Sequence, residues 1–248
     1  MKEKTNITYN QADDFPIAIR FFEEGRIPAA EKTLKDIIRK NPYDTDALLF
    51  LGGIYLSEGS YDKAERCYKK IISLVEDHPT ANYNIAFVLH KSDRLYEAEE
   101  YYKKTLLINP NHIDALHNLG DLYTALGKNE DALNYYNEVI KLNSGRSKTL
   151  VNIAKLLSSR DEYEKAEYYY SQAIFFDPLN FNYMLDLSEC FVKQNKYEKA
   201  VNNLEMIIKE QPDCREAIKM LGEVYVLKGD SVKANECFER ESKLNPPL

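Results

Sequence analysis

The sequence predicts an all-α protein built from a tandem array of short helical hairpins. Residues 109–143 contain two amphipathic patterns joined by a Gly-containing turn. Leu116 and Tyr123 lie on one face of the first pattern, and Ala132 and Tyr136 on one face of the second, at the spacing of a 3.6-residue helix. The same pattern recurs when the window moves 34 residues in either direction, and a fixed period in this range is typical of a solenoid.

The period is unbroken along nearly the whole chain. Alanine recurs every 34 residues without insertion or deletion, at Ala30, Ala64, Ala98, Ala132, Ala166, Ala200 and Ala234. The units are 11–44, 45–78, 79–112, 113–146, 147–180, 181–214 and 215–248. Residues 1–10 are a separate N-terminal segment, for which we leave open disorder and packing against the first helix.

Each unit also carries its own turn and stop signals. Five residues before each alanine stands a residue suited to a tight turn: Gly25, Gly59, Asp93, Gly127, Asp161, Asn195 and Gly229. Proline follows most of the alanines by twelve residues and ends the second helix. Gly or Ala at the eighth position of a unit, as at Gly52, allows two helices to approach closely, and buried aromatic rings fill the space beside them. A helix pair cannot bury its apolar face alone, so we expect the pairs to stack.

The motifs resemble the tetratricopeptide repeat, which has the order L-G-x-x-Y, then A-x-x-x-Y/F, then P. They are Leu51-Gly52, Tyr55, Ala64 and Tyr68; Leu119-Gly120, Tyr123, Ala132 and Tyr136; and Leu221-Gly222, Tyr225, Ala234 and Phe238. The resemblance covers residues 11–248. It implies a right-handed superhelical solenoid of seven helix-turn-helix units, about one superhelical turn long, with the first helix of each unit on the concave surface.

The two ends differ from the internal units. We expect Asp13 or Asp14 to cap the first helix and Pro16 to lie in its first turn. In the last unit, Glu241, Ser242 and Asn235 replace residues that are apolar or small elsewhere. The final helix is therefore predicted to face water and to cap the array.

Composition excludes several classes of function. The net charge is −7 and there is no basic run, which excludes a nucleic-acid partner, because binding phosphates needs clustered cations. No apolar run is long enough to insert in a membrane and no signal-peptide core is found, so we expect a cytoplasmic protein. Four cysteines without a C-x-x-C pair indicate reduced thiols.

No motif for catalysis or for a cofactor is found. The sequence lacks G-x-G-x-x-G, the P-loop, H-E-x-x-H and the serine nucleophile elbow. His78 and His112 share one loop position, and His90 and His117 are expected on first-helix faces, none beside a second metal ligand. The sequence thus predicts no enzyme activity, no metal and no cofactor.

Three asparagines form the most specific pattern on the expected concave surface. Asn84, Asn118 and Asn152 stand at the same position of three successive units. They resemble the asparagine ladder in the superhelical part of O-linked N-acetylglucosamine transferase, which holds an extended peptide backbone. An amide can donate and accept at once, as a peptide backbone requires, and we expect the side chains to face solvent. Asparagine is also common here in the repeat, so a ladder without function stays open.

The surroundings of the ladder change character along the chain. The candidate peptide-binding residues are Asn84, Phe87, His117, Asn118, Asp121, Lys148, Asn152, Lys155, Asp186 and Glu189. Lys148 and Lys155 are predicted to make the middle basic, and Asp186 and Glu189 to begin an acidic part. An apolar face for a partner is predicted from Phe15, Ile19, Phe22, Leu49 and Phe50.

These observations predict a non-catalytic scaffold or adaptor for protein–protein interaction. The predicted ligand is an extended segment of a protein or peptide partner. Two alternatives remain: a homo-oligomeric platform that assembles through the N-terminal apolar face, and the substrate-recruiting subunit of a separate enzyme.

Overall fold

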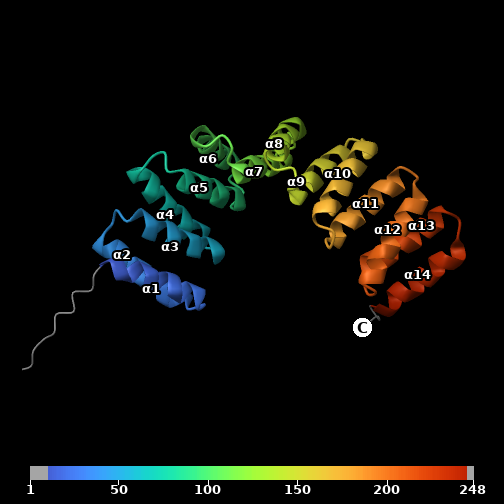
Figure 1. Cartoon of the computed structure of the whole chain (residues 1–248), viewed down its shortest axis with the longest axis horizontal. Coiled ribbons are helices and arrows are strands. Elements are labelled where there is room, and N and C mark those ends of the chain that lie inside the picture. The colour runs from blue at the N-terminus through green and yellow to red at the C-terminus, as the bar shows by residue number, and fades with distance from the viewer. Residues whose placement is uncertain (1–10, 245–248) are drawn as a thin grey trace, which may run out of the picture. The chain divides into compact units, whose positions relative to one another are not determined.

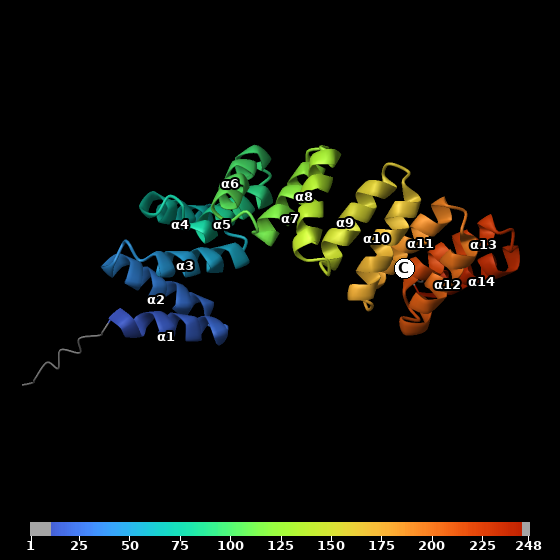
Figure 2. The ribbon, with the colours of Figure 1, turned by 45° about the horizontal axis from the view of Figure 1, so that its top comes forward.

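The computed structural model describes residues 11–244, with side chains from Asp14 onward, and these residues form an all-α repeat structure (Figures 1 and 2). The chain divides into two compact units, the first ending at Leu126 and the second beginning at Gly127. Helices follow one another in pairs within the described range: α1 Gln11–Glu23, α2 Ile27–Lys40, α3 Thr45–Ser57, α4 Tyr61–Leu74, α5 Pro79–Lys91, α6 Leu95–Ile108, α7 Ile113–Ala125, α8 Asn129–Leu142, α9 Ser147–Ser158, α10 Tyr163–Phe176, α11 Phe181–Lys193, α12 Tyr197–Glu210, α13 Arg215–Leu227 and α14 Ser231–Leu244.

Within each unit, every helix packs on the next one in the chain. In the first unit this stacking runs from α1 to α7, and α5 also contacts α7. In the second it runs from α8 to α14, and α11 also contacts α13. Contacts therefore join neighbours along the array, as the 34-residue period predicts.

The predicted turn residues adopt the conformation that the turns need. Gly25, Gly59, Gly127 and Gly229 have positive φ, and so do Asp93, Asp161 and Asn195, with φ of 57–60°. Glycine adopts the left-handed region freely, and Asp and Asn tolerate it better than other residues do. The turn prediction is confirmed at all seven positions.

The repeated alanines and aromatic rings form the core. All seven alanines are buried, as are the rings of Tyr68, Tyr102, Tyr136 and Tyr170. A Cβ atom on Gly52 would lie 2.5 Å from Cε1 of Tyr68. The absence of a side chain at Gly52 is thus what lets α3 and α4 approach across this ring.

A polar contact that the sequence analysis missed joins successive repeats of the first unit. The Tyr55 hydroxyl donates to Glu31 of the preceding repeat over 2.7 Å, and Lys35 pairs with the same carboxylate at 2.6 Å. Two repeats later, Tyr123, Glu99 and Lys103 form the same arrangement. Such buried tyrosines need a partner for the hydroxyl, and the carboxylate provides it.

The first helix starts earlier than predicted. It begins at Gln11, so Asp13 and Asp14 lie inside it and do not cap it, and Pro16 lies beyond its first turn. The Asp14 carboxylate instead pairs with Lys40 of α2 at 2.8 Å. This ion pair gives the aspartate a role that does not depend on the helix start.

The last helix is polar, as predicted. Ala234 is its one buried residue, and Asn235 and Ser242 are exposed. Glu241 differs from the prediction, because it is half-buried and its carboxylate accepts a hydrogen bond from Nε of Arg215.

Candidate functional site

An apolar cavity of about 430 Å³ opens between α1 and α3 in the first unit. Phe15, Phe22, Leu49 and Phe50 line it, together with Asp46, Gly53 and Ile54. The Phe50 ring meets Phe15 and Phe22 edge-on, with centroids 5.9 and 5.4 Å away, and 37% of Phe22 is exposed. Four of the five residues predicted for an apolar face therefore line one cavity, whereas Ile19 is half-buried and does not.

The asparagines of the first unit are less exposed than predicted. Asn84 and Asn118 are both half-buried. Asn118 Nδ2 donates to the Tyr83 hydroxyl over 3.1 Å, and the Tyr83 ring stacks on His112 at 4.7 Å. The Asn118 amide is thus tied to the neighbouring repeat and is only partly exposed to solvent.

Three other predicted residues of the first unit lie in different environments. Phe87 is half-buried, and the Lys91 ammonium lies 5.3 Å from its ring centroid. His117 is only 2% exposed, with Nε2 3.5 Å from Oδ2 of Asp121. Burial removes His117 from the surface that a ligand could touch, so its assignment to the groove is corrected, whereas Asp121 remains half-exposed.

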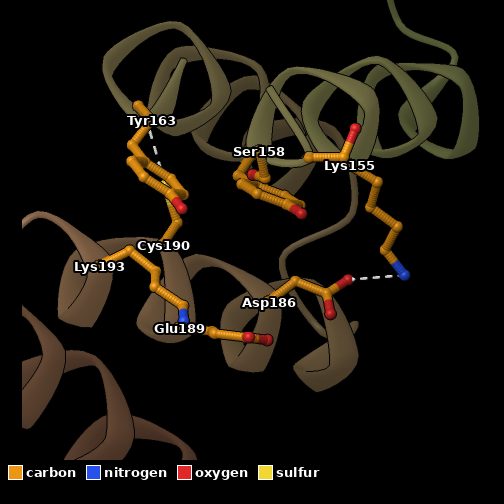
Figure 3. A pocket seen from close by; sticks show the side chains of 9 residues that line it. Lys155, Ser158, Tyr163, Asp186, Glu189, Cys190 and Lys193 are labelled. Carbon is orange, nitrogen blue, oxygen red and sulfur yellow. Dashed lines mark hydrogen bonds and ion pairs between the residues drawn. The ribbon is translucent and has the colours of Figure 1, made fainter. Parts of the chain in front are cut away.

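A polar cavity of about 350 Å³ lies among α9, α10 and α11 in the second unit (Figure 3). Its lining residues are Lys155, Ser158, Ser159, Tyr163, Tyr170, Asp186, Glu189, Cys190 and Lys193. Lys155 Nζ pairs with Asp186 Oδ2 at 3.0 Å, as the dashed line in Figure 3 shows. The predicted change from a basic to an acidic surface is therefore wrong for these two residues, because their charges largely cancel.

The neutral groups of this cavity are held protonated. Burial raises the pKa of the Cys190 thiol, which donates to the Tyr163 carbonyl oxygen over 3.3 Å. Burial also raises the pKa of Tyr170. A protonated thiol is a poor nucleophile, so neither group is activated for covalent chemistry.

A second cavity of about 310 Å³ adjoins the polar one. Val192, Met220, Val224 and Leu227 give it an apolar lining, and Glu189, Lys193 and Glu223 complete it. Glu189 and Lys193 line both cavities. The first helices of the last three repeats, α9, α11 and α13, therefore carry a polar and an apolar cavity that meet at one acidic and one basic side chain.

The sequence analysis named Lys155, Asp186 and Glu189 here but missed the apolar part. Met220 and Leu227 stand at the sixth and thirteenth positions of their unit, which the resemblance to the tetratricopeptide repeat places on the concave surface. The register was thus the signal that could have identified them.

Two predicted residues of the second unit lie outside these cavities. Asn152 is half-buried, and its Nδ2 donates to the Tyr136 hydroxyl over 3.2 Å. Lys148 is exposed. Asn152 is therefore also less exposed than predicted.

The histidine prediction is confirmed at the two loop positions. His78 and His112 precede α5 and α7, and Nδ1 of each accepts from the backbone N–H three residues later at 3.2 Å. Within residues 11–244, no group of three or more His, Cys, Asp or Glu is placed to hold a metal ion. In the same range no helix has the length and apolar character needed to cross a bilayer.

Paired helices on a fixed period, with cavities on the first helices of successive pairs, define a helical-repeat scaffold for protein interaction. Sequence profiles of the tetratricopeptide repeat match residues 77–144, residues 117–181, and residues 21–83 together with 157–224. The chain belongs to the tetratricopeptide-repeat family. The comparison with curated proteins found no match.

Solved structures share the fold at low sequence identity. A tetratricopeptide repeat protein from Parabacteroides merdae aligns with a TM-score of 0.71 at 20% identity, covering 95% of this chain and 93% of its own. The C-terminal part of a TPR repeat-containing protein from Cytophaga hutchinsonii gives 0.76 at 16% identity, covering 94% and 96%. YrrB, described as a TPR protein with an unusual peptide-binding site, gives 0.63 at 16% identity, covering 72% and 92%.

Proposed function

We propose that this chain is a non-catalytic scaffold that binds an extended peptide segment of a partner protein in a concave groove formed by the first helices of its repeats. The observation that carries the proposal is the pair of adjoining cavities on α9, α11 and α13, which share Glu189 and Lys193. Successive side chains of an extended peptide point in alternate directions, so adjoining cavities suit two residues of one segment.

The lining chemistry suggests which residues such a segment carries. Glu189 and Glu223 favour a basic residue, and Met220 with Leu227 favours an apolar one. The fold similarity to YrrB, whose description names a peptide-binding site, supports this class of ligand.

A display library of linear peptides tests the proposal directly. Peptides selected on the whole chain are measured by fluorescence anisotropy against the wild type, Glu189→Lys and Glu210→Lys. Glu210 is exposed on α12 and lies outside both cavities, so it controls for the change in net charge. We expect Glu189→Lys to weaken binding about tenfold or more and Glu210→Lys to leave it unchanged. Failure to select any linear peptide, or equal affinities for the three proteins, would contradict the proposal.

The cavity between α1 and α3 favours a second candidate function, assembly into homo-oligomers. Its phenylalanine-rich lining is the type of surface that a protein interface buries. If the chain self-associates there, Phe22→Ser should reduce the molar mass measured by light scattering to that of a monomer. A wild-type chain that is monomeric at all concentrations rules this candidate out.

Recruitment of substrates to a separate enzyme is a special case of the scaffold. It would appear as an enzyme that copurifies with the chain and loses that association in Glu189→Lys. A cytoplasmic location belongs to the same proposal, since the four free cysteines fit a reducing compartment.

A further inference from the structure

A third cavity of the first unit has a different composition from those above. It measures about 460 Å³ and lies between α2 and α4, with α3 as its floor. Leu48, Leu51 and Ile38 contribute apolar surface. The remaining lining residues are Lys35, Tyr55, Lys63, Arg66, Cys67 and Lys70. It shares no residue with the cavity between α1 and α3 and lies in a different unit from those on α9–α13.

The cavity lies where the second repeat differs from the three repeats that follow it. Cys67 is the twenty-third residue of its unit, and the next three units have tyrosine there: Tyr101, Tyr135 and Tyr169. In the third repeat the Tyr101 ring is half-buried, and the Lys104 ammonium lies 5.1 Å from its centroid. The small thiol of Cys67 thus leaves open the space that a ring takes up one repeat later.

The rim of the cavity is basic. Lys35 pairs with Glu31 at 2.6 Å, but Lys63, Arg66 and Lys70 form no ion pair with any carboxylate among the described side chains. The Lys63 ammonium lies 5.2 Å from the centroid of the Tyr55 ring, which favours its position at the rim.

Two nearby carboxylates already pair with other cations. Glu65 of α4 pairs with Lys69 at 2.7 Å and with Arg94 of α6 at 2.8 Å, and Asp36 of α2 pairs with Arg39 at 3.0 Å.

Two positions of the rim carry the opposite charge in the next repeat. In the third repeat the residues equivalent to Lys63 and Arg66 are Glu97 and Glu100. The site in the second repeat is therefore open and basic. The equivalent site in the third repeat is covered by the Tyr101 ring and bears two acidic residues. The rim is thus a basic region of a chain whose overall net charge is −7.

We propose that this cavity is a second docking site, separate from the peptide groove, for an acidic segment of a partner protein that inserts one large apolar side chain. The apolar floor takes the inserted side chain, and the three unpaired cations attract carboxylates on either side of it.

A short peptide fits this cavity better than an extended polyanion does. A membrane surface or a nucleic acid would also meet the rest of an acidic protein, which repels it. Neither would place an isolated apolar side chain on Leu48 and Leu51. An acidic peptide with one apolar anchor is short enough to contact only the cavity and its rim.

The test uses the whole chain and a defined probe, the peptide DEDFLDE, whose phenylalanine is the apolar anchor, labelled with an uncharged fluorophore and measured by fluorescence anisotropy. Two control peptides are DEDSSDE, which lacks the anchor and the leucine beside it, and KKKFLKK, which reverses the charge. Losing burial of the anchor should weaken binding about 10- to 100-fold. Equal binding of either control peptide would overturn the proposal, and so would no binding of DEDFLDE up to about 1 mM.

Protein variants locate the site. Cys67→Tyr fills the cavity with the residue of the next three repeats and should abolish binding. Lys63→Glu with Arg66→Glu gives the rim of the third repeat and should weaken binding about tenfold. The matched control, Lys32→Glu with Lys209→Glu, makes the same change in net charge at exposed positions outside the cavity and should have no effect.

The outcomes are decisive in either direction. Unchanged affinity in the rim variant places the peptide elsewhere and overturns the proposal, even if Cys67→Tyr fails to fold by circular dichroism. Binding to vesicles of anionic lipid, or to a single-stranded oligonucleotide, without binding of DEDFLDE would identify a polyanion site and equally overturn it. Because the groove variant Glu189→Lys leaves this cavity intact, it should bind DEDFLDE like the wild type.

Discussion

Two adjacent glycines in α3 should respond in opposite directions to the same substitution. A Cβ atom on Gly52 would lie 2.5 Å from Cε1 and 2.8 Å from Cζ of Tyr68, whose ring is fully buried and cannot move aside. A Cβ atom on Gly53 would meet nothing within 4 Å. Gly52→Ala and Gly53→Ala therefore make the same change of helix propensity, and only the first one overpacks the core.

The expected magnitude follows from two opposing effects. Alanine inside a helix is favoured over glycine by about 1 kcal/mol, so Gly53→Ala should stabilise the chain by up to that amount. Overpacking a closely packed contact costs about 1–3 kcal/mol. Gly52→Ala should then be less stable than Gly53→Ala by about 1–3 kcal/mol. For a chain of this length, that difference corresponds to roughly 2–12 °C in melting temperature.

Thermal unfolding followed by circular dichroism measures the difference, with urea unfolding as a second probe because repeat arrays can depart from two-state behaviour. Equal melting temperatures for the two variants, or a more stable Gly52→Ala, would show that the helices do not approach across the Tyr68 ring. The packing argument for the regular spacing of small residues along the chain would then fail.

Three further predictions concern polar contacts. Asn118→Ala should lower the melting temperature, because it removes a hydrogen bond worth about 0.5–1.5 kcal/mol, whereas Asn84→Ala should not, since no such bond joins Asn84 to a described side chain. Hydrogen bonds from Lys35 and, to a smaller extent, from Tyr55 hold the pKa of Glu31 below its ordinary value. The ionised Glu31 carboxylate therefore stabilises the fold above its unfolded-state pKa, and this stabilisation is lost as the pH falls through its folded-state pKa. Glu31→Gln should accordingly lower stability at neutral pH but not in strong acid. Glu241→Ile with Ser242→Ile should expose an apolar patch on α14 and raise the molar mass seen by light scattering; an unchanged monomer would contradict the capping role.

The parts of the fold that depend on local chemistry were predictable from sequence. Asp93, Asp161 and Asn195 stand where other repeats have glycine, and all three adopt the left-handed conformation. Ala234 and its equivalents are buried because their spacing fixes their place in every helix pair. The start of α1 was predicted wrongly, because an aspartate that looks like a cap can equally form an ion pair, as Asp14 does with Lys40.

Cavities were harder to predict, because a cavity depends on side chains that do not fill space. The repeat register placed Met220 and Leu227 on the correct face but gave no sign that they leave a cavity between α11 and α13. The substitution of Cys67 for tyrosine was visible in the sequence, but its effect depends on α2, α3 and α4 coming together. His117 shows the converse, since a residue at a surface position of the repeat is buried by its neighbours.

The asparagines show how structure changes a functional argument without removing it. Nδ2 of Asn118 and Nδ2 of Asn152 each donate a hydrogen bond to a tyrosine hydroxyl, which takes up one of the two N–H donors of each amide. The remaining amide capacity includes the carbonyl oxygen, which accepts from a peptide N–H. A ligand bound through these carbonyl oxygens would depend on the tyrosine hydroxyls that fix the orientation of the asparagine amides. Tyr83→Phe should then weaken binding, although the Tyr83 ring itself would not touch the ligand. A ladder of asparagines that acted by donation alone would instead bind more tightly once the competing hydroxyl is removed, so the sign of the Tyr83→Phe effect distinguishes the two mechanisms.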